Sequence, residues 1–205
     1  MYVRLPILLS TLAIAISLFT VAFTSYQQFF KGPSLKIVLS DRIRTWLDPR
    51  GKLVINVVVT VLNGGARYGV LTRIAGEFGA RGQPTRIPID WVMFIEHANV
   101  GEEGKRFAPH GSFAGWADQL VIPARQAISK EIQFISREPF ELKAGHYELR
   151  LQGYVGDKPV TKGKAVFDTE LSGKAIARLE NCRADPETKV AKESVMLLRG
   201  ELHGA

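Results

Sequence analysis

The distribution of hydrophobic residues divides the chain into an apolar N-terminal segment and a longer region of alternating residues. Residues 5–23, LPILLSTLAIAISLFTVAF, contain no charged side chain. At about 1.5 Å per residue, a helix of this length spans roughly 28 Å, close to the hydrocarbon thickness of a bilayer. Lipid offers the backbone no hydrogen-bonding partner, so a helix is the expected structure. We therefore predict a transmembrane anchor within residues 1–30.

The residues that flank this segment indicate whether it is cleaved and which way it crosses the membrane. Tyr26, Phe29 and Lys31 follow it, as in an interfacial belt. A cleaved signal peptide is the alternative, although VAFTS lacks the small residues of a good cleavage site. A simple charge count would place the folded part in the cytoplasm. A short basic head before an apolar run is instead typical of a signal-anchor that exports the downstream domain, and we predict export.

After the breaker KGP at 31–33, apolar residues recur with the period of two that is typical of strands. About eight strands follow, at the spacing expected of a sandwich or barrel, and no long helical pattern separates them. The predicted strands lie within residues 34–40, 52–63, 68–79, 88–97, 119–123, 127–136, 140–155 and 163–171. Segment 52–63, KLVINVVVTVLN, is apolar on both faces and is predicted to be central.

The alternation also predicts which residues face the core. The residues assigned to the buried face in the better-patterned segments are Leu35, Ile37, Leu39, Val70, Ile74, Phe78, Ile89, Trp91, Met93, Ile95, Ile128, Ile132 and Phe134.

A glycine and a tyrosine at the start of one strand carry an architectural resemblance. In LKAGHYEL a leucine precedes a turn, Gly145 permits it, and Tyr147 begins the alternation of Leu149 and Leu151. This order resembles the tyrosine corner of immunoglobulin-like sandwiches, in which the hydroxyl bonds an upstream backbone group. The resemblance implies an immunoglobulin-like antiparallel β-sandwich over residues 34–171, without the Cys pair and Trp of antibody domains.

The C-terminal tail, residues 172–205, has a weaker pattern. Ser172 is a candidate N-cap for a short helix with Ile176 and Leu179 on one side. The apolar stretch VMLL at 195–198 fits an extra strand, a docking helix or a partner-binding segment.

Charge and cysteine content narrow the classes of protein. A net charge of +7 without any basic cluster predicts a mildly basic surface and no specific nucleic-acid partner. The single Cys182 cannot form an internal disulfide, and no Asn-x-Ser/Thr glycosylation motif occurs. These features favour a bacterial envelope over a eukaryotic cell surface.

Motifs for catalysis, metals and cofactors are not found in the sequence. The four histidines, His97, His110, His146 and His203, do not have the spacing of metal ligands. The chain has no G-x-S-x-G elbow, and GEEGKR at 101–106 lacks the spacing of a phosphate-binding loop. We therefore predict no catalytic residue, no metal and no cofactor.

An irregular segment, residues 98–119, is the candidate for function, because long loops often carry it. Its glycines alternate with aromatic residues, and the candidate binding residues are Phe107, His110, Phe113 and Trp116. These side chains would bind a sugar, a peptide or lipid headgroups. Alternatively, the rings fold back over an open sheet edge.

The sequence thus predicts a single-pass protein of the cytoplasmic (inner) membrane with its β-sandwich held outside the cytoplasm. We predict a non-catalytic interaction or assembly module of the bacterial envelope, whose partner is a protein or an envelope polymer. The alternative is an envelope hydrolase or carbohydrate-active domain that uses the 98–119 loop. In that case Glu102, His110 and Asp118 would converge in a cleft.

Overall fold

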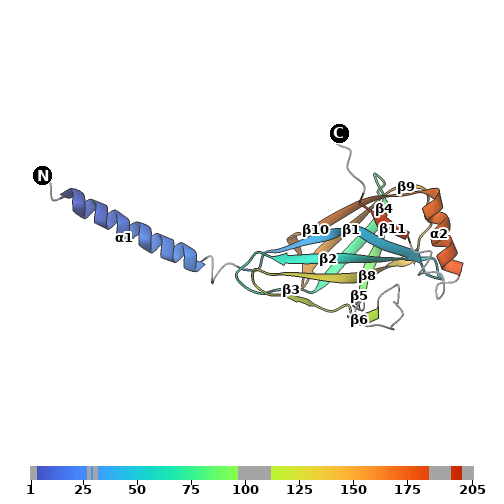
Figure 1. The fold of residues 1–205 in the computed structure, drawn as a ribbon, viewed down its shortest axis with the longest axis horizontal. Helices are drawn as coiled ribbons and strands as arrows, with labels where there is room; N and C mark the ends of the chain where they lie inside the picture. Colours follow the sequence, from blue (N-terminus) through green and yellow to red (C-terminus); the bar gives the residue numbers. More distant parts are fainter. Residues whose placement is uncertain (1–3, 27–28, 30–31, 97–111, 185–194, 200–205) are drawn as a thin grey trace, which may run out of the picture.

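A computed structural model describes residues 4–26, 29, 32–96, 112–184 and 195–199 of the 205-residue chain. The N-terminal helix α1, Arg4–Ser25, projects away from a domain of strands, on the opposite side from the second helix (Figure 1). Its segment Ile7–Ser25 is long and apolar enough to cross a membrane, and none of it is buried against the domain. The predicted N-terminal apolar helix is therefore confirmed.

The domain contains eleven strands and one further helix in the described residues. The strands are β1 Leu35–Leu47, β2 Lys52–Asn63, β3 Gly69–Leu71, β4 Arg73–Ala80, β5 Ile87–Glu96, β6 Ser112–Trp116, β7 Leu120–Ile122, β8 Ala127–Pro139, β9 Gly145–Val155, β10 Lys158–Leu171 and β11 Val195–Leu198, and the helix is α2 Gly173–Ala184. The predicted mainly-β class is confirmed.

Seven strands form one closed, barrel-like sheet. The strands follow the order β10-β9-β4-β5-β8-β2-β1, and each of the six pairings between neighbours is antiparallel. A parallel pairing between Lys36 of β1 and Lys162 of β10 closes the sheet. The sequence predicted two stacked sheets, whereas the observed sheet wraps around a single interior. Strands β3 and β7 form a separate two-stranded ribbon near the end that adjoins α1 (Figure 1).

Closure of the sheet requires small residues where side chains from different strands meet inside it. A Cβ atom on Gly76 would lie 2.4 Å from Cγ1 of Ile89, and one on Gly153 would lie 2.7 Å from Cδ1 of Ile37. Large apolar side chains fill the remaining interior, including the fully buried Phe78, Phe134 and Phe167. The barrel is a packed core and not an open channel.

Two predicted inward faces are corrected where the chain departs from regular alternation. Thr72 separates β3 from β4, so Leu71 is buried whereas Val70 is only half-buried; Ile74 is buried as predicted. A register shift between Trp91 and Met93 interrupts the pairing of β5 with β8, so Trp91 lies opposite the buried Phe134, whereas Met93 and Ile95, predicted to face inward, lie opposite Gln133 and Glu131 on the outer face.

Strand β1 is longer than predicted because a bulge interrupts its alternation. The register with β2 shifts between Leu39 and Ile43, after which the strand continues to Leu47. The C-terminal region packs on this added half. Strand β11 pairs antiparallel with residues 42–45, and Leu179 of α2 is fully buried in the same core. The hydroxyl of Ser172 accepts a hydrogen bond from the N–H of Ala175 at 3.2 Å, as an N-cap does.

The start of β9 has the hydrogen bonds of a tyrosine corner. The buried Tyr147 hydroxyl donates to the carbonyl of Lys143 at 2.9 Å and accepts from the N–H of Lys143 at 3.0 Å. Its ring stacks on Phe78 at 5.2 Å between centroids. Gly145 has a φ of +153°, which side-chain-bearing residues rarely adopt. This turn fixes the entry of the chain into β9.

Candidate functional site

Pairing across five strands places five residues on one row of the outer sheet surface. Directly opposed residues of antiparallel strands share a face. Arg44 lies opposite Asn56, which lies opposite Gln133. Gln133 in turn lies opposite Met93, which lies opposite Trp116 of β6. At about 4.8 Å per strand, this row extends over roughly 19 Å from Arg44 to Trp116. We call it the central row.

A parallel row runs beside it toward the N-terminal side of β1. Val58 lies opposite Glu131, which lies opposite Ile95, and Ile95 lies opposite Phe113. The two rows together carry polar side chains at the β1 side and aromatic side chains at the β6 side.

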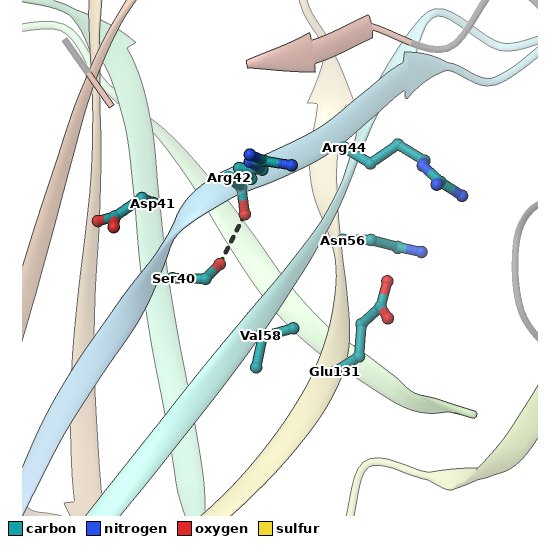
Figure 2. A pocket seen from close by; sticks show the side chains of 7 residues that line it. All are labelled: Ser40, Asp41, Arg42, Arg44, Asn56, Val58 and Glu131. Atoms are coloured by element: carbon teal, nitrogen blue, oxygen red, sulfur yellow. Dashed lines mark hydrogen bonds between the residues drawn. The ribbon is translucent and has the colours of Figure 1, made fainter. Parts of the chain in front are cut away.

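The β1 side of these rows contains a cavity of about 490 Å³. Its lining residues are Ser40, Asp41, Arg42, Arg44, Asn56, Val58 and Glu131 (Figure 2). The bulge in β1 accounts for its position, because three residues, 40–42, lie opposite the single residue Val58 of β2. The hydroxyl of Ser40 donates to the carbonyl of Arg42 at 2.6 Å and so holds the bulge. We call this cavity the bulge pocket.

An amide with one unsatisfied end lines the bulge pocket. Asn56 is 1% exposed, and its Oδ1 accepts a hydrogen bond from Nε2 of Gln133 at 3.0 Å. Its Nδ2 has no hydrogen-bond partner among the described residues. Figure 2 shows this nitrogen directed toward the space between Arg44 and Glu131. A buried donor without a partner costs about 1–3 kcal/mol, and a ligand with an acceptor oxygen would remove that cost.

The charges of the bulge pocket suit hydrogen bonding to a polar ligand. Arg42 and Arg44 contribute positive charge, and Asp41 and Glu131 contribute negative charge. Arg44 and Glu131 each also take part in a further interaction within the protein. In the part of the chain that the structure describes, no group of three His, Cys, Asp or Glu residues is placed to hold a metal ion.

The β6 side of the rows presents two exposed aromatic rings in contact. Phe113 and Trp116 are 55% and 69% exposed, and their rings meet edge to face at 5.0 Å between centroids. Regular alternation would place residues three apart on opposite faces of a strand. The register shift between Phe94 and Ile95 leaves Ala114 as an extra residue in β6, which turns both rings to the same side.

The structure brings together two of the four candidate binding residues, Phe113 and Trp116. The other two, Phe107 and His110, lie outside the described residues, as does Glu102. The prediction of an irregular segment over 98–119 is wrong for residues 112–116, which form β6 along β5 beyond its pairing with β4. Asp118 accepts a hydrogen bond from the N–H of Gln119 at 2.7 Å, which is a local turn contact.

Sequence reasoning missed the bulge pocket. Its one sequence signal is Asn56, a polar residue in the otherwise apolar run LVINVVV of a central strand. A buried amide in such a run needs hydrogen-bond partners for both its oxygen and its nitrogen. Gln133 on the neighbouring strand supplies a donor for the oxygen alone.

A second cavity, of about 550 Å³, adjoins the tyrosine corner. Its walls come from the β4–β5 turn, including Arg81 and Gln83, and from the start of β9, including Gly145 and Tyr147. His146 is exposed there. The hydrogen bonds of Tyr147 within this wall hold the turn in place, and the cavity does not adjoin the two rows.

No family model and no curated protein matches this chain. Solved structures give only distant similarities. A protein named as ApaA from Bordetella pertussis has 10% identity and a TM-score of 0.33, over 83% of this chain and 98% of its own. A protein named as the lipoprotein YcdA from Bacillus subtilis has 14% identity and a TM-score of 0.35, over 74% of this chain.

The third structure is β-glucosidase 3B from Thermotoga neapolitana in complex with glucose, with 15% identity and a TM-score of 0.31 over 71% of this chain. The chain spans 41% of the Bacillus protein and 19% of the Thermotoga protein. Similarities at this level indicate neither a shared fold nor a shared function.

Proposed function

We propose that the protein is a non-catalytic binding module, anchored in the inner membrane of a bacterial envelope, with its β domain outside the cytoplasm. The partner is a protein or an envelope polymer that binds across the central row. The observation that carries this proposal is the position of Asn56 and Trp116 on one row. A buried donor that has no partner in the described part of the chain and an exposed ring face the same side of the sheet.

The spacing of these groups favours an extended ligand. Asn56 and Trp116 are three strands apart, which corresponds to roughly 14 Å. Binding sites commonly combine aromatic anchors with a few directional polar groups. The Phe113–Trp116 pair supplies apolar surface for a sugar ring or an apolar side chain. The bulge pocket supplies hydrogen bonds to a polar group of the same molecule.

The apolar helix α1 supports the anchoring part of the proposal. An uncleaved anchor confines the module to the membrane, so its local concentration near membrane or cell-wall partners is high. Modest affinity at the central row is then sufficient for occupancy. A reporter fused after residue 205 tests the orientation, and the proposal requires activity of a reporter that works only outside the cytoplasm.

The immunoglobulin-like architecture is also part of the proposal. The two hydrogen bonds of Tyr147 with the backbone of Lys143 support it, because they have the form of a tyrosine corner. The closed sheet would then be a variant in which the two halves of the sandwich join through β1 and β10.

Site-specific photocrosslinking tests the binding face. A benzophenone amino acid replaces Trp116 in the full-length protein expressed in bacterial cells. The same group at Val166, on β10 and 37% exposed, is the matched control. We expect strong adducts from position 116 and far weaker adducts from position 166. Adding Asn56→Val should weaken the adducts from position 116. Digestion by a protease or by a peptidoglycan hydrolase distinguishes a protein from a polymer.

Equal adducts at positions 116 and 166 would contradict the proposed face. Adducts at position 116 that are unaffected by Asn56→Val would separate the aromatic pair from the bulge pocket and remove the argument for one extended site.

A further inference from the structure

The end of the barrel next to α1 is built around the buried side chain of Asn63. This anchor-side end comprises residues 62–73, 120–126 and 153–158. Oδ1 of Asn63 accepts from the N–H of Ser34 at 3.2 Å, and the carbonyl of Ser34 accepts from the N–H of Gly64 at 2.9 Å. The connection that leads from α1 is therefore fixed to this end of the barrel.

A second contact brings the end of the barrel close to the end of the helix. Nε of Arg67 donates to the carbonyl of Phe29 at 3.4 Å. Phe29 follows Ser25, the last residue of α1, by four positions, which span at most about 14 Å of chain. The side chain of Phe29 is itself 65% exposed. Figure 1 shows that this end of the barrel faces α1, so it lies near the bilayer surface if α1 spans a bilayer.

This end also exposes apolar side chains that the barrel core does not use. Tyr68 is 68% exposed, Val121 is 52% exposed and Val155 is 44% exposed. They come from the β2–β3 connection, from β7 and from the end of β9. An exposed tyrosine beside aliphatic residues is typical of a surface that enters the interfacial layer of a membrane.

Exposed basic side chains accompany these apolar groups. Arg67 lies beside Tyr68, Arg125 lies in the β7–β8 turn, and Lys158 begins β10; Asp157 is the acidic residue of the β9–β10 turn. Arg125 has a φ of +57°, a conformation that favours glycine or asparagine. Its N–H donates to the carbonyl of Gly65 at 3.2 Å. This backbone bond holds the turn, and the side chain of Arg125 is exposed at its tip.

We propose that the anchor-side end is a lipid-binding surface that rests on anionic phospholipid. Tyr68, Val121 and Phe29 enter the interfacial layer, and Arg67 and Arg125 bind headgroup phosphates. The barrel axis is thereby held upright on the membrane, with the turns at Arg50 and Gln83 facing away. This inference depends on the proposed retention of α1 as an anchor.

Depth-dependent fluorescence quenching tests the proposal with the full-length protein. In a Cys182→Ser background, single cysteines at positions 18, 68, 121 and 83 carry an environment-sensitive label. The proteins are reconstituted into phosphatidylcholine liposomes with about 30% phosphatidylglycerol. The quencher is phosphatidylcholine brominated near the headgroup end of its acyl chains. Position 18 reports on α1. Position 83 lies at the far end of the barrel, one strand length, or about 33 Å, from the anchor-side end.

We expect emission at positions 68 and 121 to fall by about half, as for groups in the interfacial layer, and emission at position 83 to be unchanged. Arg67→Glu with Arg125→Glu should abolish the quenching at position 121 in anionic liposomes. Arg50→Glu, in the turn at the far end, is the matched charge control and should leave it intact. Arg67→Lys with Arg125→Lys should retain most of it, and circular dichroism checks the fold of each variant.

Quenching at position 18 without quenching at positions 68 and 121 would overturn the lipid surface and leave the anchor standing. Absence of quenching at position 18 would overturn the anchor itself, and this proposal with it. A third outcome is no quenching at position 68 together with disulfide crosslinks between unlabelled Tyr68→Cys proteins. That result would overturn the lipid surface and show that a second copy of the chain covers this end.

Discussion

The side-chain oxygen of Asn63 accepts a hydrogen bond from the backbone N–H of Ser34, 29 residues earlier in the chain. The same oxygen accepts from the N–H of Gly65 at 2.9 Å. The nitrogen Nδ2 donates to the carbonyls of Arg67 at 2.7 Å and of Ile122 and Pro123 at 3.2 Å. One buried side chain thus joins the connection from α1, the end of β2 and the end of β7.

Asn63→Ala should therefore destabilise the domain by about 3 kcal/mol, because it leaves several buried backbone groups without partners. Urea unfolding of the full-length protein in detergent micelles, followed by tryptophan fluorescence, measures the change. Gln126→Ala removes an exposed amide at the same end and should change stability by less than about 0.5 kcal/mol. Equal effects of the two substitutions would show that Asn63 does not organise this end.

Tyr147→Phe tests the tyrosine corner. The substitution keeps the ring stacked on Phe78 but removes a hydroxyl that both donates to and accepts from the backbone of Lys143. We expect a loss of about 1–3 kcal/mol in the free energy of unfolding. Tyr154→Phe, on the same strand, keeps its ring beneath the Arg73 guanidinium and should be nearly neutral. A neutral Tyr147→Phe would mean that water or another group replaces the hydroxyl.

Gly76→Ala tests whether small residues permit the sheet to close. The added methyl group would overlap Ile89 and Leu151, with contacts of 2.4 Å and 2.8 Å. Overpacking of this kind costs about 1–3 kcal/mol, measured by the same unfolding experiment. Gly115→Ala, on β6, meets nothing within 4 Å and is the matched control. Stability of Gly76→Ala equal to that of Gly115→Ala would show that the barrel interior yields easily at this point.

The sequence predicts those parts of the fold that depend on local pattern. Segment 52–63 has the same bounds as β2, and the apolar helix and the tyrosine turn lie where their residues indicate. The closure between Lys36 and Lys162 has no such local signal. A period of two shows which face of a strand is buried, but not which edges pair. The bulge at residues 40–42 also hides the second half of β1, because the polar run Ser40-Asp41-Arg42 interrupts the apolar alternation.

The candidate site shows the same division. Aromatic residues between glycines led to Phe113 and Trp116 without indicating that one extra residue, Ala114, turns both rings to one side. The bulge pocket combines residues from β1, β2 and β8 that are distant in sequence. Only the pairing of these strands brings Asn56, Arg44 and Glu131 together, so no spacing in the sequence reveals the pocket.

The ion pairs of Glu148 predict a loss of stability in acid. Burial raises the pKa of Glu148, but the hydrogen bond from Arg150 and the charges of Arg86, Arg150 and Arg81 outweigh this effect and hold the pKa below its ordinary value. A lowered pKa in the folded state stabilises the protein above the unfolded pKa of about 4.3. That contribution is lost as the pH falls through the folded pKa.

Glu148→Gln should therefore flatten the dependence of unfolding free energy on pH between about pH 5 and pH 2. Urea unfolding at a series of pH values measures the slope. Glu141→Gln, whose side chain is 84% exposed beside Lys143, should leave the slope as in the unmodified protein. An unchanged slope in Glu148→Gln would assign the acid sensitivity to other carboxylates.

Replacing Asn56 and Gln133 together should leave the stability of the fold intact, whereas replacing Gln133 alone should lower it. Gln133→Val removes the hydrogen bond that Oδ1 of Asn56 accepts, which leaves neither end of this buried amide with a partner among the described residues, and stability should fall by about 1–3 kcal/mol. Asn56→Val with Gln133→Val removes both polar groups from strands that suit β-branched residues, and should be at least as stable as the original protein. The same double substitution should weaken the crosslinks formed from position 116. A double variant as unstable as the sum of the two single ones would show that the amide pair serves the fold, and the argument for a ligand in the bulge pocket would then fail.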